Sequence, residues 1–362
     1  MIRRVAVASL VLAGAAQAQA QAQSADPGYR VGVVSESADI VTWLRPVPGG
    51  LARDHVVPVG VMPSDNDGPH NLAVSRDQKS YYVTIAHGTP FGSLWKLDVA
   101  GDTVLGRAEV ELFPTTIGLT PDGQFAFVAN SDFHGDHPRV NVVSVVHLPT
   151  MTKITDLPSC DMPHGVKVNH AGTRVYLSCM HSDEILELQV GTFAITRRVA
   201  TGGAHAMAGM SMECAPTFVS VSPDDRRLYV ACNYGNSLQV WDAATLTRVK
   251  EIPLGKGAYN VEPSPDGKLV LVTNKKEQSV SLVDAARLTE LARIPTSKKV
   301  VHGVAFSPDG RLAYVSCESI GADPGAVDVI DLGTRKLISS IAVPGQPTGI
   351  AIRSLGLQTS TH

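Results

Sequence analysis

One β-rich sequence repeat, built around a tight turn, occurs in six full copies along this 362-residue chain. The copies begin at Pro69, Pro114, Pro163, Pro216, Ala258 and Val301, and a shortened seventh copy begins at Pro347. A repeat of this length forms one structural unit that cannot bury its own apolar face, so neighbouring units must stack on each other. The repeat therefore restricts the chain to a repetitive array before any single residue is considered.

Each copy predicts a set of antiparallel strands. In the copy that begins at Val301, residues 303–307 and 312–316 form apolar runs on either side of a Pro-Asp-Gly turn. An Asp-Gly pair between two such runs indicates a β-hairpin. Two more short strands follow each hairpin, as at residues 279–284 and 290–295. Four antiparallel strands per unit, with copies spaced by 42 to 53 residues, are typical of a propeller blade.

The residue seven positions before the turn aspartate gives each blade one reference position, which we call its anchor. The anchors are His70, Thr115, His164, Thr217, Tyr259, His302 and Thr348. Seven anchors predict an all-β, seven-bladed β-propeller of four-stranded antiparallel blades. The last copy has only one strand before the chain ends. We therefore expect strands at residues 29–35, 39–44 and 55–59 to complete this blade and to close the ring by pairing with the C-terminal strand.

The N-terminal residues 1–22 have the pattern of a secretory signal peptide. Arg3 and Arg4 precede a short apolar run, and small residues suited to cleavage follow at positions 18–22. We predict that residues 23–362 form a single propeller domain, periplasmic or secreted, monomeric and without a membrane span. Removing the two arginines changes the formal net charge from −3 to −5, so nucleic acid is not an expected partner.

Reactive side chains gather at one face of the predicted ring. The first strands begin and the second strands end at this upper face, whereas the Pro-Asp-Gly turns lie at the lower face. His70, His164 and His302 are anchors at the mouth of the central channel, and His87 and His181 follow second strands. Three histidines are a common set of metal ligands. The alternative is that each imidazole only donates a hydrogen bond to a neighbouring blade.

The segment from His205 to Cys214 adds soft ligands at the same face. It contains Met207, Met210 and Met212, and it ends just before the copy that begins at Pro216, so we expect it to overhang the channel mouth. Thioether and thiolate groups favour Cu(I). The sequence therefore predicts a copper site, with zinc as the alternative metal. The candidate ligands are His70, His87, His164, His181, His205, Met207, Met210, Met212, Cys214 and His302. Methionines that only fill gaps over an apolar lid would give the same pattern.

Five cysteines in an exported protein leave at least one thiol without an intramolecular partner. Cys179, Cys232 and Cys317 each lie fifteen residues after their anchor, and Cys160 and Cys214 precede the following copies. A disulfide between Cys160 and Cys214 would remove both from a metal site. Small, buried packing between blades is the alternative for Cys232 and Cys317.

The second strands end in a recurring four-residue pattern. It reads YVTI, FVAN, YLSC, YVAC, LVTN and YVSC, beginning at Tyr82, Phe127, Tyr176, Tyr229, Leu271 and Tyr314. The pattern resembles the YVTN-type (YncE-like) propeller family over essentially the whole mature chain. This resemblance implies the propeller fold and leaves function open among binding platforms, relatives of lactonases and parts of redox enzymes. Residues 163–165, Pro-His-Gly, are locally similar to the propeller of nitrous oxide reductase, where such histidines hold copper.

Three functions follow as hypotheses. The first is an exported binding protein that holds a transition metal or small molecule at the channel mouth and passes it to a periplasmic protein partner. The second is a metal-dependent redox enzyme or a lactonase-like hydrolase. The nitrous oxide reductase activity is not expected, because this chain lacks the second copper domain of that enzyme. The third is a metal-free platform for protein interaction. The sequence leaves open whether the protein is an enzyme.

Overall fold

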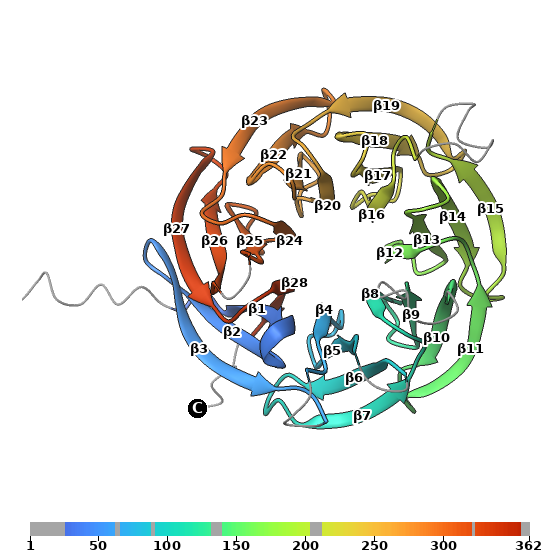
Figure 1. Ribbon diagram of the computed structural model, residues 1–362, viewed down its shortest axis with the longest axis horizontal. Helices are drawn as coiled ribbons and strands as arrows, with labels where there is room; N and C mark the ends of the chain where they lie inside the picture. The colour runs from blue at the N-terminus through green and yellow to red at the C-terminus, as the bar shows by residue number, and fades with distance from the viewer. Residues whose placement is uncertain are drawn as a thin grey trace, which may run out of the picture.

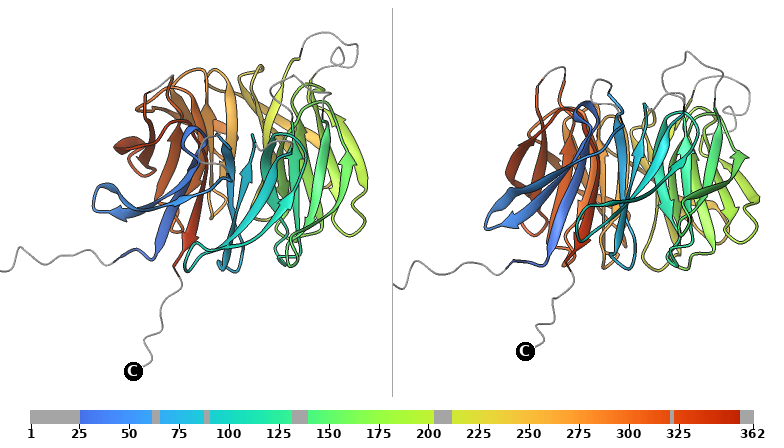
Figure 2. Two further views of the ribbon diagram at one scale, coloured as in Figure 1. Left: turned by 60° about the horizontal axis from the view of Figure 1, so that its bottom comes forward. Right: turned by 90° about the horizontal axis from the view of Figure 1, so that it is seen from below.

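The structure is a computed structural model that describes residues 26–61, 66–87, 91–131, 140–202, 212–320 and 323–355. Its strands form seven four-stranded antiparallel sheets arranged as a ring (Figure 1). The inner strands of all seven sheets line a central channel. In side view the strands of all the sheets run across the thickness of a disc (Figure 2). The predicted all-β, seven-bladed propeller is confirmed.

Six blades follow one another along the chain, and the innermost strand comes first in each. Blade 1 has β4 (Pro69–Val74), β5 (Ser80–Ile85), β6 (Ser93–Asp98) and β7 (Val104–Glu109); blade 2 has β8 (Pro114–Leu119), β9 (Phe125–Asn130), β10 (Val142–His147) and β11 (Thr152–Pro158); blade 3 has β12 (Pro163–Val168), β13 (Arg174–Cys179), β14 (Glu184–Gln189) and β15 (Ile195–Ala200). Blade 4 has β16 (Pro216–Val221), β17 (Arg227–Cys232), β18 (Ser237–Asp242) and β19 (Thr247–Pro253); blade 5 has β20 (Ala258–Pro263), β21 (Leu269–Asn274), β22 (Ser279–Asp284) and β23 (Thr289–Pro295); blade 6 has β24 (Val301–Phe306), β25 (Leu312–Cys317), β26 (Gly325–Asp331) and β27 (Lys336–Val343).

Blade 7 is built from both ends of the chain. Its strand order is β28 (Pro347–Ser354), β1 (Tyr29–Ser35), β2 (Ile40–Val47) and β3 (Gly50–Pro58). β28 and β1 pair antiparallel, with Val31 opposite Ile352. This sheet is therefore consistent with the predicted closure of the ring by N-terminal strands that pair with the C-terminal strand. The outer strand is longer than the expected residues 55–59, because a tight turn with Gly49 at φ +76° lets β3 start directly after β2.

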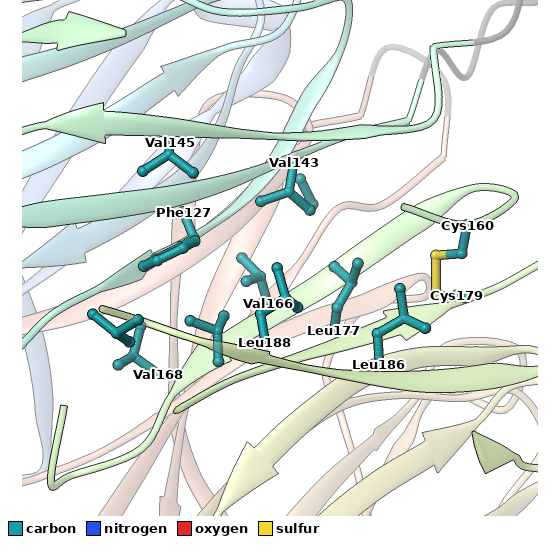
Figure 3. Close-up of a cluster of buried hydrophobic side chains, with 13 residues drawn as sticks. Phe127, Val143, Val145, Cys160, Val166, Val168, Leu177, Cys179, Leu186 and Leu188 are labelled. Atoms are coloured by element: carbon teal, nitrogen blue, oxygen red, sulfur yellow. A yellow bond between two sulfur atoms is a disulfide. The ribbon is translucent and has the colours of Figure 1, made fainter. Parts of the chain in front are cut away.

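The core lies between the blades rather than inside any one of them. Between blades 2 and 3, for example, Phe127 and Val145 pack against Leu177 and Leu188, and all four side chains are fully buried. Figure 3 shows this row of apolar side chains between the two sheets. Burial of this kind explains why one repeat cannot fold alone and why seven can.

Glycine follows the anchor histidine in blades 3 and 6 because neighbouring inner strands approach closely there. A Cβ atom placed on Gly303 would lie 2.6 Å from the carbonyl oxygen of Thr348 in blade 7. The histidine-glycine pair thus lets adjacent inner strands come together directly behind the imidazole.

We expect Gly303→Ala to lower the free energy of unfolding by about 1–3 kcal/mol, the usual cost of overpacking. Urea unfolding followed by circular dichroism measures this change. Gly191→Ala is the matched control, because its added Cβ would meet nothing within 4 Å. Equal urea midpoints for the two variants would contradict the close approach of blades 6 and 7.

Within the part of the chain that the structure describes, no helix has the length and hydropathy of a membrane span.

Candidate ligand site at the channel mouth

Rings from five blades meet around the upper end of the central channel. Each ring lies against the next, with centroid distances of 5.1 Å for His164–Phe218, 5.4 Å for Phe218–Tyr259, 4.8 Å for Tyr259–His302 and 5.4 Å for His302–His70. All three predicted histidine anchors therefore belong to one chain of contacting rings. All three are also buried, with exposed fractions of 0% for His164, 1% for His302 and 6% for His70.

The small threonine anchors hold the backbone of these ring-bearing anchors in place. The Thr115 hydroxyl donates to the carbonyl oxygen of His164 (3.0 Å), and the Thr348 hydroxyl donates to that of His70 (2.8 Å). Both threonines are buried. Each of these hydrogen bonds joins the inner strand of one blade to that of the next, and so fixes the backbone of an anchor histidine relative to the neighbouring blade.

His164 makes hydrogen bonds with both ring nitrogens. Its Nδ1 lies 2.8 Å from the carbonyl oxygen of Thr217, which can only accept, so Nδ1 carries the proton. Its Nε2 lies 3.1 Å from the Tyr259 hydroxyl and accepts from it. His164 therefore follows the alternative that the sequence left open, a histidine hydrogen-bonded to a neighbouring blade.

His70 and His302 differ from His164, because buried ring nitrogens remain without a hydrogen bond. Among the residues that the structure describes, Nε2 of His70 and both ring nitrogens of His302 have no hydrogen-bond partner. The nearest carboxylate oxygen to His302, on Glu318, is 3.8 Å from Nε2 and beyond hydrogen-bonding distance. A buried polar atom without a partner costs about 1–3 kcal/mol, so we expect a water molecule, an ion or another ligand to contact these nitrogens in the native protein.

The buried imidazoles of His164 and His302 are neutral near pH 7. Burial, together with the charges of His70 and Lys275, lowers the pKa of His164 to about 3. Burial, with the charge of Lys275 next in importance, also lowers the pKa of His302 well below its ordinary value. A neutral imidazole has a lone pair, which is the form that binds a metal.

A lysine and a glutamate form the charged edge of this site. Lys275 Nζ lies 2.7 Å from Glu318 Oε1 and 4.2 Å from the centre of the Tyr259 ring. Although burial opposes its charge, the neighbouring Tyr259 and Glu318 raise the pKa of Lys275. The lysine therefore stays cationic, and its charge helps to keep His302 neutral.

Glu36 completes the mouth, and the sequence analysis did not identify it. It lies on the short helical turn η1 (Glu36–Ala38) between β1 and β2. Its carboxylate oxygens are 3.1 Å from Nδ1 of His70 and 2.9 Å from Nε2 of His87. Burial favours the neutral acid, but hydrogen bonds from the two histidines hold the pKa of Glu36 well below its usual range. The predicted residue His87 thus joins the site through Glu36.

The other predicted ligands have different positions. His181 is exposed, and Met212 is half-buried. Cys214 is bonded to Cys232, so its sulfur offers no thiolate. His205, Met207 and Met210 lie outside the described residues.

The structure pairs the cysteines differently from the Cys160–Cys214 bond that the sequence analysis considered. Cys160 bonds to Cys179 and Cys214 bonds to Cys232, with sequence separations of 19 and 18 residues. Each bond ties the connection that enters a blade to the end of the second strand of that blade. The similar spacing of the two pairs was a sequence signal for this pairing, and it was missed.

Small, buried packing between blades, the alternative for Cys232 and Cys317, describes only Cys317, because Cys232 forms a disulfide. Cys317 is free and buried, and burial beside Asp328 raises the pKa of its thiol well above the ordinary value. Elsewhere, Cys160, Cys179 and Glu184 are the one group of three potential ligand atoms within 4.8 Å of each other in the described part of the chain. The disulfide between the two cysteines excludes thiolate coordination there.

The lower part of the channel is a separate cavity of about 620 Å³. Its wall combines aliphatic and polar groups from the inner strands of all seven blades, with Lys167 and Glu262 paired at 3.1 Å across it. The unpartnered imidazole nitrogens described above do not line this cavity. These nitrogens are therefore a feature of the upper mouth alone.

Comparisons with known proteins agree with the propeller fold. The family model of the cytochrome D1 heme domain matches residues 265–356, from blade 5 to the inner strand of blade 7. No curated protein matches the chain.

Three solved structures illustrate the similarity of fold. A periplasmic gluconolactonase, PpgL, of Pseudomonas aeruginosa is 18% identical, with a TM-score of 0.73 over 90% of this chain and 99% of that one. A functionally unknown protein from Desulfotomaculum acetoxidans is 14% identical, with the same TM-score and coverage. The dihydro-heme d1 dehydrogenase NirN, in complex with DHE, is 17% identical, with a TM-score of 0.60 over 91% of this chain and 76% of that one. At these identities the likeness shows the fold alone.

Proposed function

We propose that this protein is an exported propeller of the YVTN type that binds a transition metal at its upper channel mouth. The observation that carries the proposal is the pair His70 and His302, whose rings lie 5.4 Å apart with three buried nitrogens that have no described partner. Export is inferred from the signal-peptide pattern of residues 1–22.

The described residues supply only some of the ligands that a metal ion would need at the mouth. At the mouth, no three side-chain ligand atoms among them lie within 4.8 Å of one another. We therefore assign His70 and His302 as the protein ligands, and His164 as a supporting residue that is already hydrogen-bonded. Imidazole nitrogen suits copper, zinc and iron. Copper is the first ion to test, because Met207 and Met210 offer soft donors in the sequence segment that precedes Pro216.

The second candidate is that the metal is the iron of a tetrapyrrole. The cytochrome D1 heme family match favours it, because residues 265–356 contain Lys275, His302 and Glu318, all at the mouth. A buried neutral histidine fits the role of an axial haem ligand, and a cationic lysine fits a carboxylate of the macrocycle. The chemistry of such a group would be its own, while these residues would bind and orient it.

The proposal predicts that the untagged protein binds one equivalent of Cu(I), measured by competition with bicinchoninate under reducing conditions. His302→Phe keeps a ring in the chain of contacts but removes both nitrogens, so we expect at least about 100-fold weaker binding, beyond the effect of a residue that only supports a ligand. His70→Phe should behave in the same way. His147→Phe, on β10 of blade 2, is the matched control and should bind as the wild type does.

Three results would decide against this reading. Equal Cu(I) affinity of His302→Phe and wild type would remove the site from the channel mouth. A shifted Soret band on titration with hemin, lost in His302→Phe, with no Cu(I) binding, would favour the tetrapyrrole. Binding of neither probe would leave the metal-free interaction platform.

A further inference from the structure

Glu36 reaches the channel mouth from the blade that closes the ring. The η1 turn that carries it is the helical turn beside β4 at the inner side of the ring (Figure 1). The Glu36 side chain is only 12% exposed, and its two oxygens contact different histidines, His70 and His87. A buried carboxylate shared between two imidazoles is a defined arrangement rather than a surface ion pair.

The carboxylate determines which nitrogen of His70 carries the proton. A glutamate carboxylate is ordinarily ionised near pH 7 and can then only accept, and the Glu36 oxygens lie 3.1 Å from Nδ1 of His70 and 2.9 Å from Nε2 of His87. His70 therefore presents Nδ1–H to Glu36, and a neutral ring must then have its lone pair on Nε2. That atom is the one that is buried without a described partner, in the ring that lies against His302.

The position of Glu36 depends on closure of the ring. Its backbone N–H donates to the carbonyl oxygen of Gln346 (3.0 Å), just before β28. At the other end of η1, the Asp39 carboxylate accepts from the backbone N–H of Gly68 (2.8 Å), just before β4. The turn is therefore tied both to the C-terminal strand of blade 7 and to the strand that carries His70.

We propose that Glu36 is a positioning residue that selects the Nδ1–H tautomer of His70 and so presents Nε2 to the ligand at the channel mouth. The identity of the ligand rests on the proposed function, whereas the tautomer of His70 does not. The arrangement is a carboxylate–histidine–metal relay, in which the outer carboxylate orients the imidazole and increases its basicity. Because Glu36 comes from blade 7, pairing of the two chain ends also completes the ligand site in blade 1.

The tautomer can be tested without any metal. Long-range ¹H–¹⁵N spectra of the histidine rings at pH 7 should show His70 protonated at Nδ1, with its signals assigned by their loss in His70→Phe. A proton on Nε2 of His70 in the wild-type protein would overturn the proposal. This result does not depend on whether Cu(I) binds, so the inference can fail while the proposed function holds, and the reverse.

The effect on binding is tested with Glu36→Gln, which has the same shape but can accept from only one of the two histidines. We expect Cu(I) affinity, again measured against bicinchoninate, to fall about 10–100-fold. Glu111→Gln, which removes a carboxylate paired with Lys153 outside the mouth, should keep the wild-type affinity. Circular dichroism verifies that both variants are folded. An affinity of folded Glu36→Gln within about twofold of wild type would overturn the proposal.

Discussion

Removing either disulfide is expected to lower the free energy of unfolding by about 3 kcal/mol, because each bond closes a loop of 18 or 19 residues in the unfolded chain. The variants are the pairs Cys160→Ala with Cys179→Ala and Cys214→Ala with Cys232→Ala. Removing both bonds should give roughly the sum of the two losses, since they lie in different blades. Urea unfolding of the oxidised proteins measures the effect.

The free cysteine provides the control for this experiment. Cys317→Ala removes one sulfur atom at the equivalent position of blade 6 without breaking a disulfide, although it removes the hydrogen bond to Asp328. Each paired variant removes two sulfur atoms, so the loss beyond twice that of the control reports the disulfide itself. Wild-type protein with the same urea midpoint before and after reduction would contradict a stabilising role for both disulfides.

Stability should also fall steeply as the pH drops from about 6.5 towards 4. His164, with a pKa of about 3, and His302, with its pKa well below the ordinary value, stay neutral in the folded protein. In the unfolded chain both take up protons near pH 6.5. The unfolded state then binds more protons, so acid favours unfolding. At pH 5 the two residues together should cost about 4 kcal/mol relative to pH 7 or above.

The double variant His164→Gln, His302→Gln isolates this contribution. We expect its unfolding free energy to depend much less on pH between 6.5 and 5 than that of the wild type, whatever its absolute stability. The groups around His302 that could also respond are Lys275, Glu318 and His70, and both proteins keep them. His147→Gln is the control. A double variant with the wild-type slope would show that the buried imidazoles are not neutral in the folded state.

The fold was predictable because the repeat determines the number of blades and shows which strands are missing from the last blade. Residues at fixed distances from the turn aspartate gave the number of blades, and the missing strands of the last copy required that 29–35 complete the ring. The outer strands were less certain, as the early start of β3 at Gly50 shows. Outer strands contact fewer neighbours, so their sequence is less restricted.

The site was predictable where it coincides with the repeat and not elsewhere. Counting from the repeat identified His70, His164 and His302, which do meet at the mouth. Glu36 lies on a three-residue turn outside every copy, so no periodicity could mark it. The different hydrogen bonding of His164 depends on the Tyr259 hydroxyl in another blade, a contact that only the folded ring creates.

Binding of a metal by His70 and His302 at the channel mouth can be seen by anomalous diffraction at the copper edge, from crystals grown with Cu(I). We expect one peak at about 2 Å, the usual metal–imidazole distance, from Nε2 of His70 and within bonding distance of a His302 nitrogen. A strong peak elsewhere, with none beside these two rings, would contradict it.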